Sequence, residues 1–203
     1  MSASISSVKH TARILFVLPL LTLLLSGCGI NDIPTDEQQA KAKWSEVLNQ
    51  YQRRTDLIPN LVETVKGFAT QEKSVLIGVT EARAKATSIK VDASTITDPE
   101  AFKKFQEAQS QLSGALGRLL AVSENYPDLK SNANFLALQS QLEGTENRIA
   151  VARRDYIEAV RVYNTDLTTF PGRIWAMILY SKNKAMEEFT IEDSAKQVPQ
   201  VKF

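Results

Sequence analysis

Apolar side chains recur at intervals of three and four residues along most of the chain, the spacing that gathers them on one face of an α-helix. The pattern divides into three long stretches, at about residues 36–87, 98–125 and 132–170. A shorter apolar run at 174–180 follows a Pro-Gly pair, which ends the preceding helix. The pattern therefore predicts three long helices and a short one near the C-terminus.

Pro59 interrupts the first stretch without shifting its apolar phase. A proline lacks the N–H that would bond the carbonyl of Thr55, and it biases Ile58 away from helical backbone. Because the apolar positions on both sides keep one register, a single helix kinked at Pro59 explains the pattern better than two helices joined by a loop.

The other two long stretches begin with cap signals. Asp98 precedes a proline, the order expected of an N-cap followed by the first helical position. Ser131 or Asn132 can cap the third stretch, whose alternating intervals are typical of a coiled-coil seam. Gly114 and Gly117 lie inside the second stretch, and close packing against a neighbouring helix would explain them.

Three long helices with short connections predict an all-α fold, an antiparallel up-and-down helical bundle. We expect the bundle at residues 37–181 and a polar C-terminal tail at 182–203. The short apolar helix is expected to close one end of the bundle. An alternative is that it forms an exposed segment that dips into a membrane or binds a partner.

Residues 1–27 have the layout of a secretory signal peptide, in which a cationic segment precedes an apolar run too short to span a membrane. The Leu-Ser-Gly-Cys sequence that ends at Cys28 resembles a bacterial lipobox. We predict cleavage between Gly27 and Cys28, acylation of Cys28 by fatty acids such as palmitate, and a lipid-anchored tether at 28–36. The alternative is an ordinary short signal, or an uncleaved anchor, that happens to contain this cysteine.

A lipid on Cys28 would hold the bundle on the cell membrane, facing away from the cytoplasm. In a host with two membranes, glycine rather than aspartate after the cysteine favours the periplasmic side of the outer membrane. The expected partners are the membrane itself, through the anchor, and other proteins of the envelope.

The amino-acid composition excludes several classes of catalytic, metal and nucleic-acid-binding site. His10 and Cys28 are the only histidine and cysteine, so a chain cleaved before Cys28 would hold no histidine and no free thiol. This excludes Ser-His-Asp and Cys-His catalysis and zinc sites built on His and Cys. Cleavage would leave 22 basic and 23 acidic residues, and no basic cluster indicates nucleic-acid binding. We therefore predict no catalytic residue, metal or cofactor.

The chain contains, in this order, QRRTDLIPNLVETVKG at 52–67, EARA at 81–84, ENYPDLK at 124–130, EGTENRIA at 143–150 with Ala152-Arg153, and Tyr163-Asn164-Thr165 followed by Phe170-Pro171. Together these segments resemble the LemA family. The resemblance implies an antiparallel helical bundle attached to a bacterial membrane by its N-terminus, with its body outside the cytoplasm and no settled biochemical activity. Many members carry an N-terminal transmembrane helix, from which this chain departs by its lipobox.

Two groups of polar residues in these segments are candidates for an interaction site. Asp56, Asn60 and Glu63 are spaced to share one helical face beside Pro59. With the freed carbonyl of Thr55, they could bind a cation such as Ca²⁺. The favoured interpretation is a polar layer between helices that involves Arg53 or Arg54 and the second group, Glu146, Asn147 and Arg148.

Three functional hypotheses follow. The favoured one is a non-enzymatic scaffold or docking protein of the bacterial envelope, because the sequence offers long amphipathic helices but no catalytic histidine or phosphate loop. The second is an ion- or small-ligand-binding bundle centred on Pro59. The third is a hydrolase that uses a pair of carboxylates such as Glu63 and Glu146.

Overall fold

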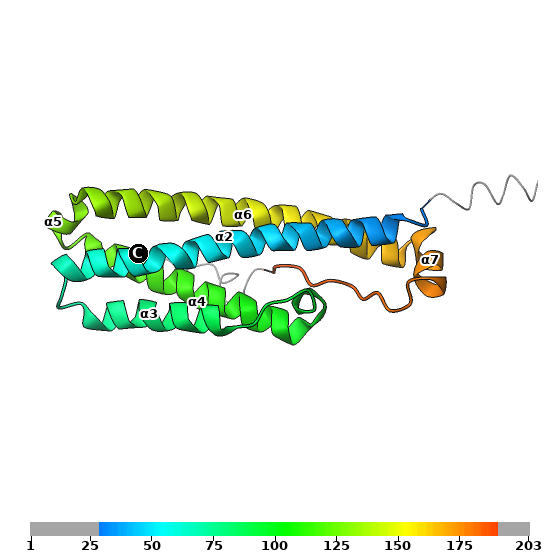
Figure 1. Ribbon diagram of the computed structural model, residues 1–203, viewed down its shortest axis with the longest axis horizontal. Helices are drawn as coiled ribbons and strands as arrows, with labels where there is room; N and C mark the ends of the chain where they lie inside the picture. The colour runs from blue at the N-terminus through cyan, green and yellow to red at the C-terminus, as the bar shows by residue number, and fades with distance from the viewer. Residues whose placement is uncertain (1–28, 191–203) are drawn as a thin grey trace, which may run out of the picture.

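Two long antiparallel helices, α2 (Asp32–Phe68) and α6 (Ala133–Thr168), run side by side along the molecule (Figure 1). The computed structural model describes residues 29–190, and this part of the chain contains no strand. The expected all-α antiparallel bundle is confirmed, with α2, α4 and α6 as its long helices and α7 as the short C-terminal one. The other elements are α3 (Lys73–Ser88), η1 (Thr95–Thr97), α4 (Pro99–Ser123), α5 (Pro127–Lys130) and α7 (Gly172–Ile178).

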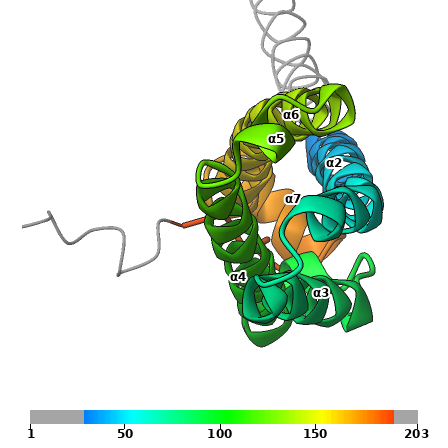
Figure 2. The same ribbon diagram turned by 90° about the vertical axis from the view of Figure 1, so that its left-hand side faces the viewer.

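The prediction of one helix from residue 36 to residue 87 is wrong. α2 continues through Pro59 but ends at Phe68, and after a short polar turn α3 runs back beside α4 (Figure 2). The apolar phase persists because Val65 of α2 and Val79 of α3 are buried in the same core cluster. Periodicity reports which face is buried, and it carries no signal for a reversal of the chain between two faces that share a core.

The N-terminal boundary also lies earlier than expected. α2 begins at Asp32, so residues 32–36 belong to the bundle and not to a tether. Ile33 is fully buried, which fixes this first turn to the core. Pro34 fits there because the first N–H groups of a helix have no partner within it.

The capping predictions are confirmed. The Asp98 carboxylate accepts hydrogen bonds from the backbone N–H groups of the second and third helical residues of α4, at 3.0 and 3.1 Å. The Asn132 side chain does the same at the start of α6. The packing expected at Gly114 and Gly117 is not present, because both are exposed and a methyl group on Gly117 would meet no atom within 4 Å.

The core has two clusters of different character. Towards the α5 end, aliphatic residues such as Leu61, Leu112 and Leu119 fill the space between α2, α3 and α4. Towards α7, an aromatic cluster surrounds Trp44, whose ring centre lies 5.2 Å from that of Phe105 and 5.3 Å from that of Tyr156. The second cluster includes no residue of α3, which runs beside only part of α2 (Figure 1).

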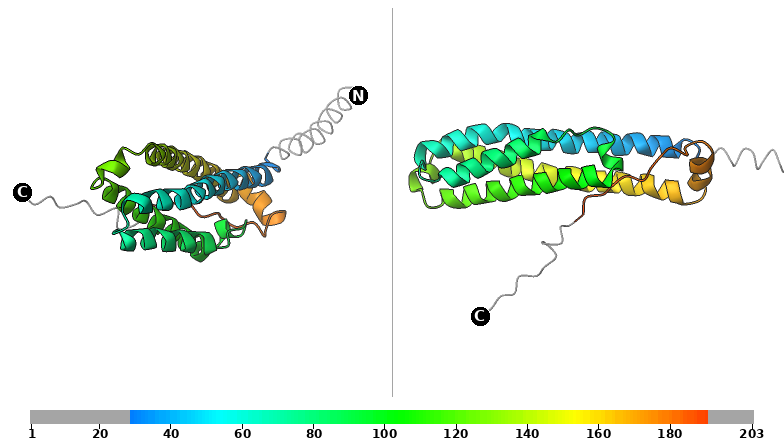
Figure 3. Two further views of the ribbon diagram at one scale, coloured as in Figure 1. Left: turned by 60° about the vertical axis from the view of Figure 1, so that its left-hand side comes forward. Right: turned by 90° about the horizontal axis from the view of Figure 1, so that it is seen from below.

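The segment after α7 packs on the aromatic cluster, to which α3 contributes no residue. The expectation of a polar tail outside the bundle is wrong for residues 182–190, which run back along the bundle in extended form (Figure 3). Asn164 of α6 clamps Met186 at both backbone groups, at 2.9 Å each, and the Tyr156 hydroxyl donates to the Glu187 carbonyl at 2.8 Å. Phe189 is buried against the aromatic cluster. We call residues 182–190 the C-terminal strap.

α7 closes the end of the bundle at which the described chain begins (Figure 1). The Tyr180 hydroxyl donates a hydrogen bond of 3.0 Å to the Ile30 carbonyl, so the start of α2 and the end of α7 are tied together. Trp175 and Ala176 pack on the core, as expected of an end cap. None of the helices in residues 29–190 combines the length and apolar character that a membrane crossing requires.

Candidate functional site

Among the buried residues of positions 29–190, Arg54 is the only one with a charged side chain. It lies on the apolar stripe of α2, three residues after Tyr51 and four before Ile58, so the helix turns its side chain into the core. Its side chain is 1% exposed. A buried guanidinium is costly unless hydrogen-bond acceptors surround it, so its environment must supply them.

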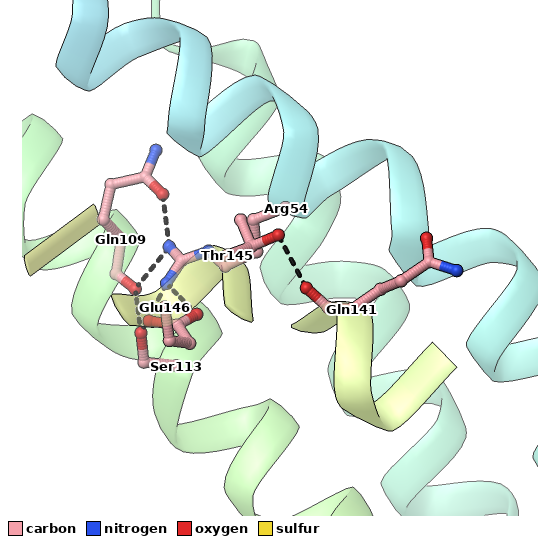
Figure 4. A network of polar contacts seen from close by, with 6 residues as sticks. All are labelled: Arg54, Gln109, Ser113, Gln141, Thr145 and Glu146. Carbon is pink, nitrogen blue, oxygen red and sulfur yellow. Dashed lines mark hydrogen bonds and ion pairs between the residues drawn. The ribbon is translucent and has the colours of Figure 1, made fainter. Parts of the chain in front are cut away.

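Three residues from two other helices supply those acceptors (Figure 4). One terminal nitrogen of Arg54 donates to Ser113 Oγ at 2.7 Å and to Glu146 Oε1 at 2.9 Å. The other donates to the side-chain oxygen of Gln109 at 2.6 Å and to its carbonyl at 3.3 Å. The network therefore joins α2, α4 and α6 at one level. Within residues 29–190, the Nε atom of Arg54 is buried and has no hydrogen-bond partner.

A groove of about 330 Å³ opens beside this network. Its lining combines Arg54 and Glu146 with Tyr51 and Arg153, whose guanidinium lies 4.3 Å from the ring centre of Phe189 in the C-terminal strap. Burial raises the pKa of the Tyr51 hydroxyl, although Arg153 and Arg54 oppose the shift. Tyr51 is therefore neutral at ordinary pH and is unsuited to act as a base. We call this the arginine groove.

A second groove, of about 380 Å³, lies between α2 and α6. It contains Asn147 and Arg148, two of the predicted site residues, together with Glu46 and Gln50 of α2. Val151, 49% exposed, adds apolar surface to it. Mixed polar and apolar lining of this kind is common where one protein surface meets another. We call this the α2–α6 groove.

The predicted site residues are thus divided by the structure. Glu146 joins the Arg54 network, whereas Asn147 and Arg148 are exposed in the α2–α6 groove. Asp56, Asn60 and Glu63 are exposed on α2. Their described side-chain bonds stay within that helix, from Gln52 to Asp56 at 2.7 Å and from Lys66 to Glu63 at 3.4 Å.

The Thr55 carbonyl, which Pro59 leaves without a donor in α2, is hydrogen-bonded to an arginine. The Nε atom of Arg83, on α3, donates to the Thr55 carbonyl at 2.9 Å. A cation on that carbonyl would lie against the positive charge of the guanidinium. Residues 29–190 contain no group of three or more acidic, His or Cys side chains arranged to hold a metal.

Sequence reasoning missed the partners of Arg54 on α4, Gln109 and Ser113. One signal for the arginine itself was available, because Arg54 continues the three-four spacing of the apolar stripe and must be buried with it. The predicted lipidation and cleavage residues, Cys28 and Gly27, lie outside the described part of the chain.

Comparison with known proteins agrees with this architecture. The family model described as "LemA family" matches residues 43–203, most of the chain. Two proteins of Paramagnetospirillum magneticum, Magnetosome protein MamQ 1 and MamQ 2, are each 27% identical over 83% of this chain and 68% of their own length. Protein LemA of Metamycoplasma hominis is 25% identical over 69% of this chain and 60% of its own. The chain belongs to the LemA family.

Proposed function

We propose that this protein is a lipoprotein of the bacterial envelope, anchored to the membrane through Cys28, that docks other envelope proteins on its helical faces without catalysing a reaction. The LemA assignment and the similarity to MamQ and LemA proteins support a membrane-associated protein. The lipobox-like sequence before Gly29 supports a lipid as the anchor.

The observation that carries the proposal is the position of Ile30. Its carbonyl is bonded to Tyr180 at one end of the elongated bundle, only two residues after Cys28. Two residues of extended chain reach about 7 Å. A lipid on Cys28 would therefore hold this end against the membrane surface, with α5 and the α2–α3 turn directed away from it (Figure 1).

The α2–α6 groove is the docking surface that we assign to partners. It lies along the side of the rod, and Arg148 and Val151 give it charge and apolar area together. The buried side-chain oxygen of Gln50 has no hydrogen-bond partner within residues 29–190, so a donor from a partner could satisfy it.

Metabolic labelling with a radioactive fatty acid tests the anchor. Wild-type protein should incorporate label and the Cys28→Ser variant should not. That variant should also keep its N-terminal segment, because cleavage at a lipobox requires the modified cysteine. Unlabelled wild-type protein, or unchanged membrane attachment and processing of the variant, would contradict the proposal.

Photocrosslinking in native membranes tests the docking surface. A photoreactive residue at Val151 should form discrete crosslinked products with other envelope proteins. Ile77, which is exposed to a similar extent on α3, is a matched control and should form far fewer. Equal patterns at both positions, or no product at Val151, would count against docking at the α2–α6 groove.

A second candidate function rests on the arginine groove. The Nε of Arg54, which has no partner among residues 29–190, and the neighbouring Arg153 favour a small anionic ligand, with the carboxylate class as the simplest case. Calorimetric titration with acetate, succinate and citrate tests this directly. Binding heat that disappears in the Arg153→Gln variant would support a ligand site, and no heat with any of the three would remove it.

A further inference from the structure

The exposed apolar side chains of the bundle are concentrated at one end. Ten large hydrophobic residues in the described chain are exposed, and five of them fall within residues 170–179. Phe170 is 81% exposed, and Met177 and Ile178 are each 66% exposed. A contiguous apolar patch is uncommon on a protein surrounded by water and often marks an interaction surface. We call these five residues the end patch: Phe170, Ile174, Met177, Ile178 and Leu179.

α7 is apolar on more than the face that it needs for packing. Its inner side contributes Trp175 and Ala176 to the core. Ile174, Met177 and Ile178 are additional apolar residues that the bundle does not cover. Apolar side chains on a helix favour an apolar environment on the side to which they point. The core provides that environment on one side only.

The first described residues of the chain indicate what covers the outer side of α7. Gly29 is close to α7, since a methyl group on it would lie 3.4 Å from Pro171 Cγ, and Ile30 is bonded to Tyr180. Cys28 is the next residue towards the N-terminus. An acyl group on Cys28 would therefore enter the bilayer within a few ångströms of the end patch.

Two cations lie beside the end patch. Arg173 within α7 and Lys182 just after it are both exposed. Cations at the rim of an apolar surface can reach lipid headgroups, and anionic headgroups attract them. The same end also carries the carboxylates of Asp32, Asp36 and Asp166, so the exposed apolar side chains and not the net charge carry the inference.

We propose that the end patch inserts into the interfacial layer of the bilayer and is a second membrane contact beside the Cys28 lipid. The inference rests on the proposed anchoring, which brings this end to the membrane. Its consequence is orientation. A lipid alone would leave the tilt of the bundle free. A lipid and a membrane-inserted helix together would fix that tilt and hold the α2–α6 groove at a constant angle to the membrane surface.

Spin labels on the lipidated full-length protein in its native membrane test the inference. A label at Met177→Cys should collide with dissolved oxygen several-fold more often, relative to a water-soluble nickel chelate, than a label at Leu136→Cys. Leu136 is a matched control, because it is 48% exposed and begins α6 at the opposite end. Ile178→Glu should reduce the lipid exposure of the Met177 label, and Ile77→Glu on α3 should leave it unchanged.

Fatty-acid labelling of the same samples separates this inference from the anchor. An acylated protein whose Met177 label is as accessible to nickel as the Leu136 label would overturn the inference and leave the anchor standing. An unacylated protein whose Met177 label is in lipid would have the opposite meaning. Strong dipolar coupling between Met177 labels of two molecules, without oxygen exposure, would show that a second copy covers the patch and would overturn the inference.

Discussion

Arg83 donates a hydrogen bond from its side chain to the backbone carbonyl of Thr55, the carbonyl that Pro59 leaves without its helical donor. The bond crosses from α3 to α2, so the carbonyl that lacks a donor within α2 links the two helices. A proline inside a long helix is tolerated here because another element satisfies the group that it frees.

This relationship predicts a specific coupling. Arg83→Met should lower the free energy of unfolding by about 1–3 kcal/mol, because the Thr55 carbonyl loses its donor next to the core. The cost should shrink in a Pro59→Ala background, where residue 59 regains an N–H for that carbonyl. Urea unfolding of the four proteins in the cycle measures the coupling. Equal costs of Arg83→Met in both backgrounds would show that the two residues act independently.

The neighbouring arginines Arg53 and Arg54 should respond differently to the same change. Arg54→Lys keeps the charge but loses the planar donors that serve Gln109, Ser113 and Glu146, so we expect a loss of about 2 kcal/mol or more in urea unfolding. Arg53 is exposed, and Arg53→Lys should change stability by no more than about 0.5 kcal/mol. Similar effects at both positions would contradict the role given to the network.

Two glycines offer opposite outcomes for one kind of substitution. At Gly172 a methyl group would overlap the Asp166 carbonyl oxygen, so Gly172→Ala must shift backbone and should cost about 1–3 kcal/mol. At Gly117, an exposed position of α4, it would meet nothing within 4 Å, so Gly117→Ala should stabilise the protein by about 0.5–1 kcal/mol. Thermal unfolding should therefore move down for the first variant and up for the second.

The stability should depend on pH through Asp36. Burial, followed by the hydrogen bond and charge of Asp166 and the charge of Asp32, raises the Asp36 pKa from 3.8 to about 6. The folded state then holds a proton that the unfolded state releases between pH 4 and 6, so this group's contribution to stability falls as pH rises through that range. Asp36→Asn removes the repulsion, and it should raise the melting temperature at pH 7.5 but have little effect at pH 4. A gain of the same size at both values would contradict this assignment.

The C-terminal strap should contribute to stability. Phe189→Ala should cost about 3 kcal/mol, because it removes a buried ring from the aromatic cluster around Trp44. Phe170→Ala is the matched control, since that ring is 81% exposed, and it should cost little in solution. Urea titrations that gave equal losses for the two variants would mean that the strap is not part of the folded bundle.

The sequence predicted the parts of the fold that depend on local signals. Asp98 and Asn132 mark the starts of α4 and α6 because a cap is a contact between near neighbours. The α2–α3 reversal was missed because an unbroken apolar register fits a long helix as well as a hairpin of two helices on one core. The strap was missed because its polar composition outweighs Met186 and Phe189, whose burial depends on distant α6 and α4.

In the candidate site too, local signals could be read from the sequence, whereas contacts made by long-range packing could not. The burial of Arg54 could have been inferred from its place on the stripe, but Gln109 and Ser113 are brought to it by the packing of α4, which no local pattern encodes. Glu146, Asn147 and Arg148 are adjacent in sequence, yet the first belongs to the Arg54 network and the others to the α2–α6 groove. Helical geometry alone separates such neighbours, but it does not say which side meets a partner.

The most direct measurement is mass spectrometry of the N-terminal tryptic peptide from protein extracted from its native membrane. We predict a peptide that begins at Cys28 and ends at Lys41, heavier than its sequence by a diacylglycerol group and an amide-linked fatty acid. A peptide in which Gly27 is still joined to an unmodified Cys28 would contradict the lipid anchor on which the proposed function depends.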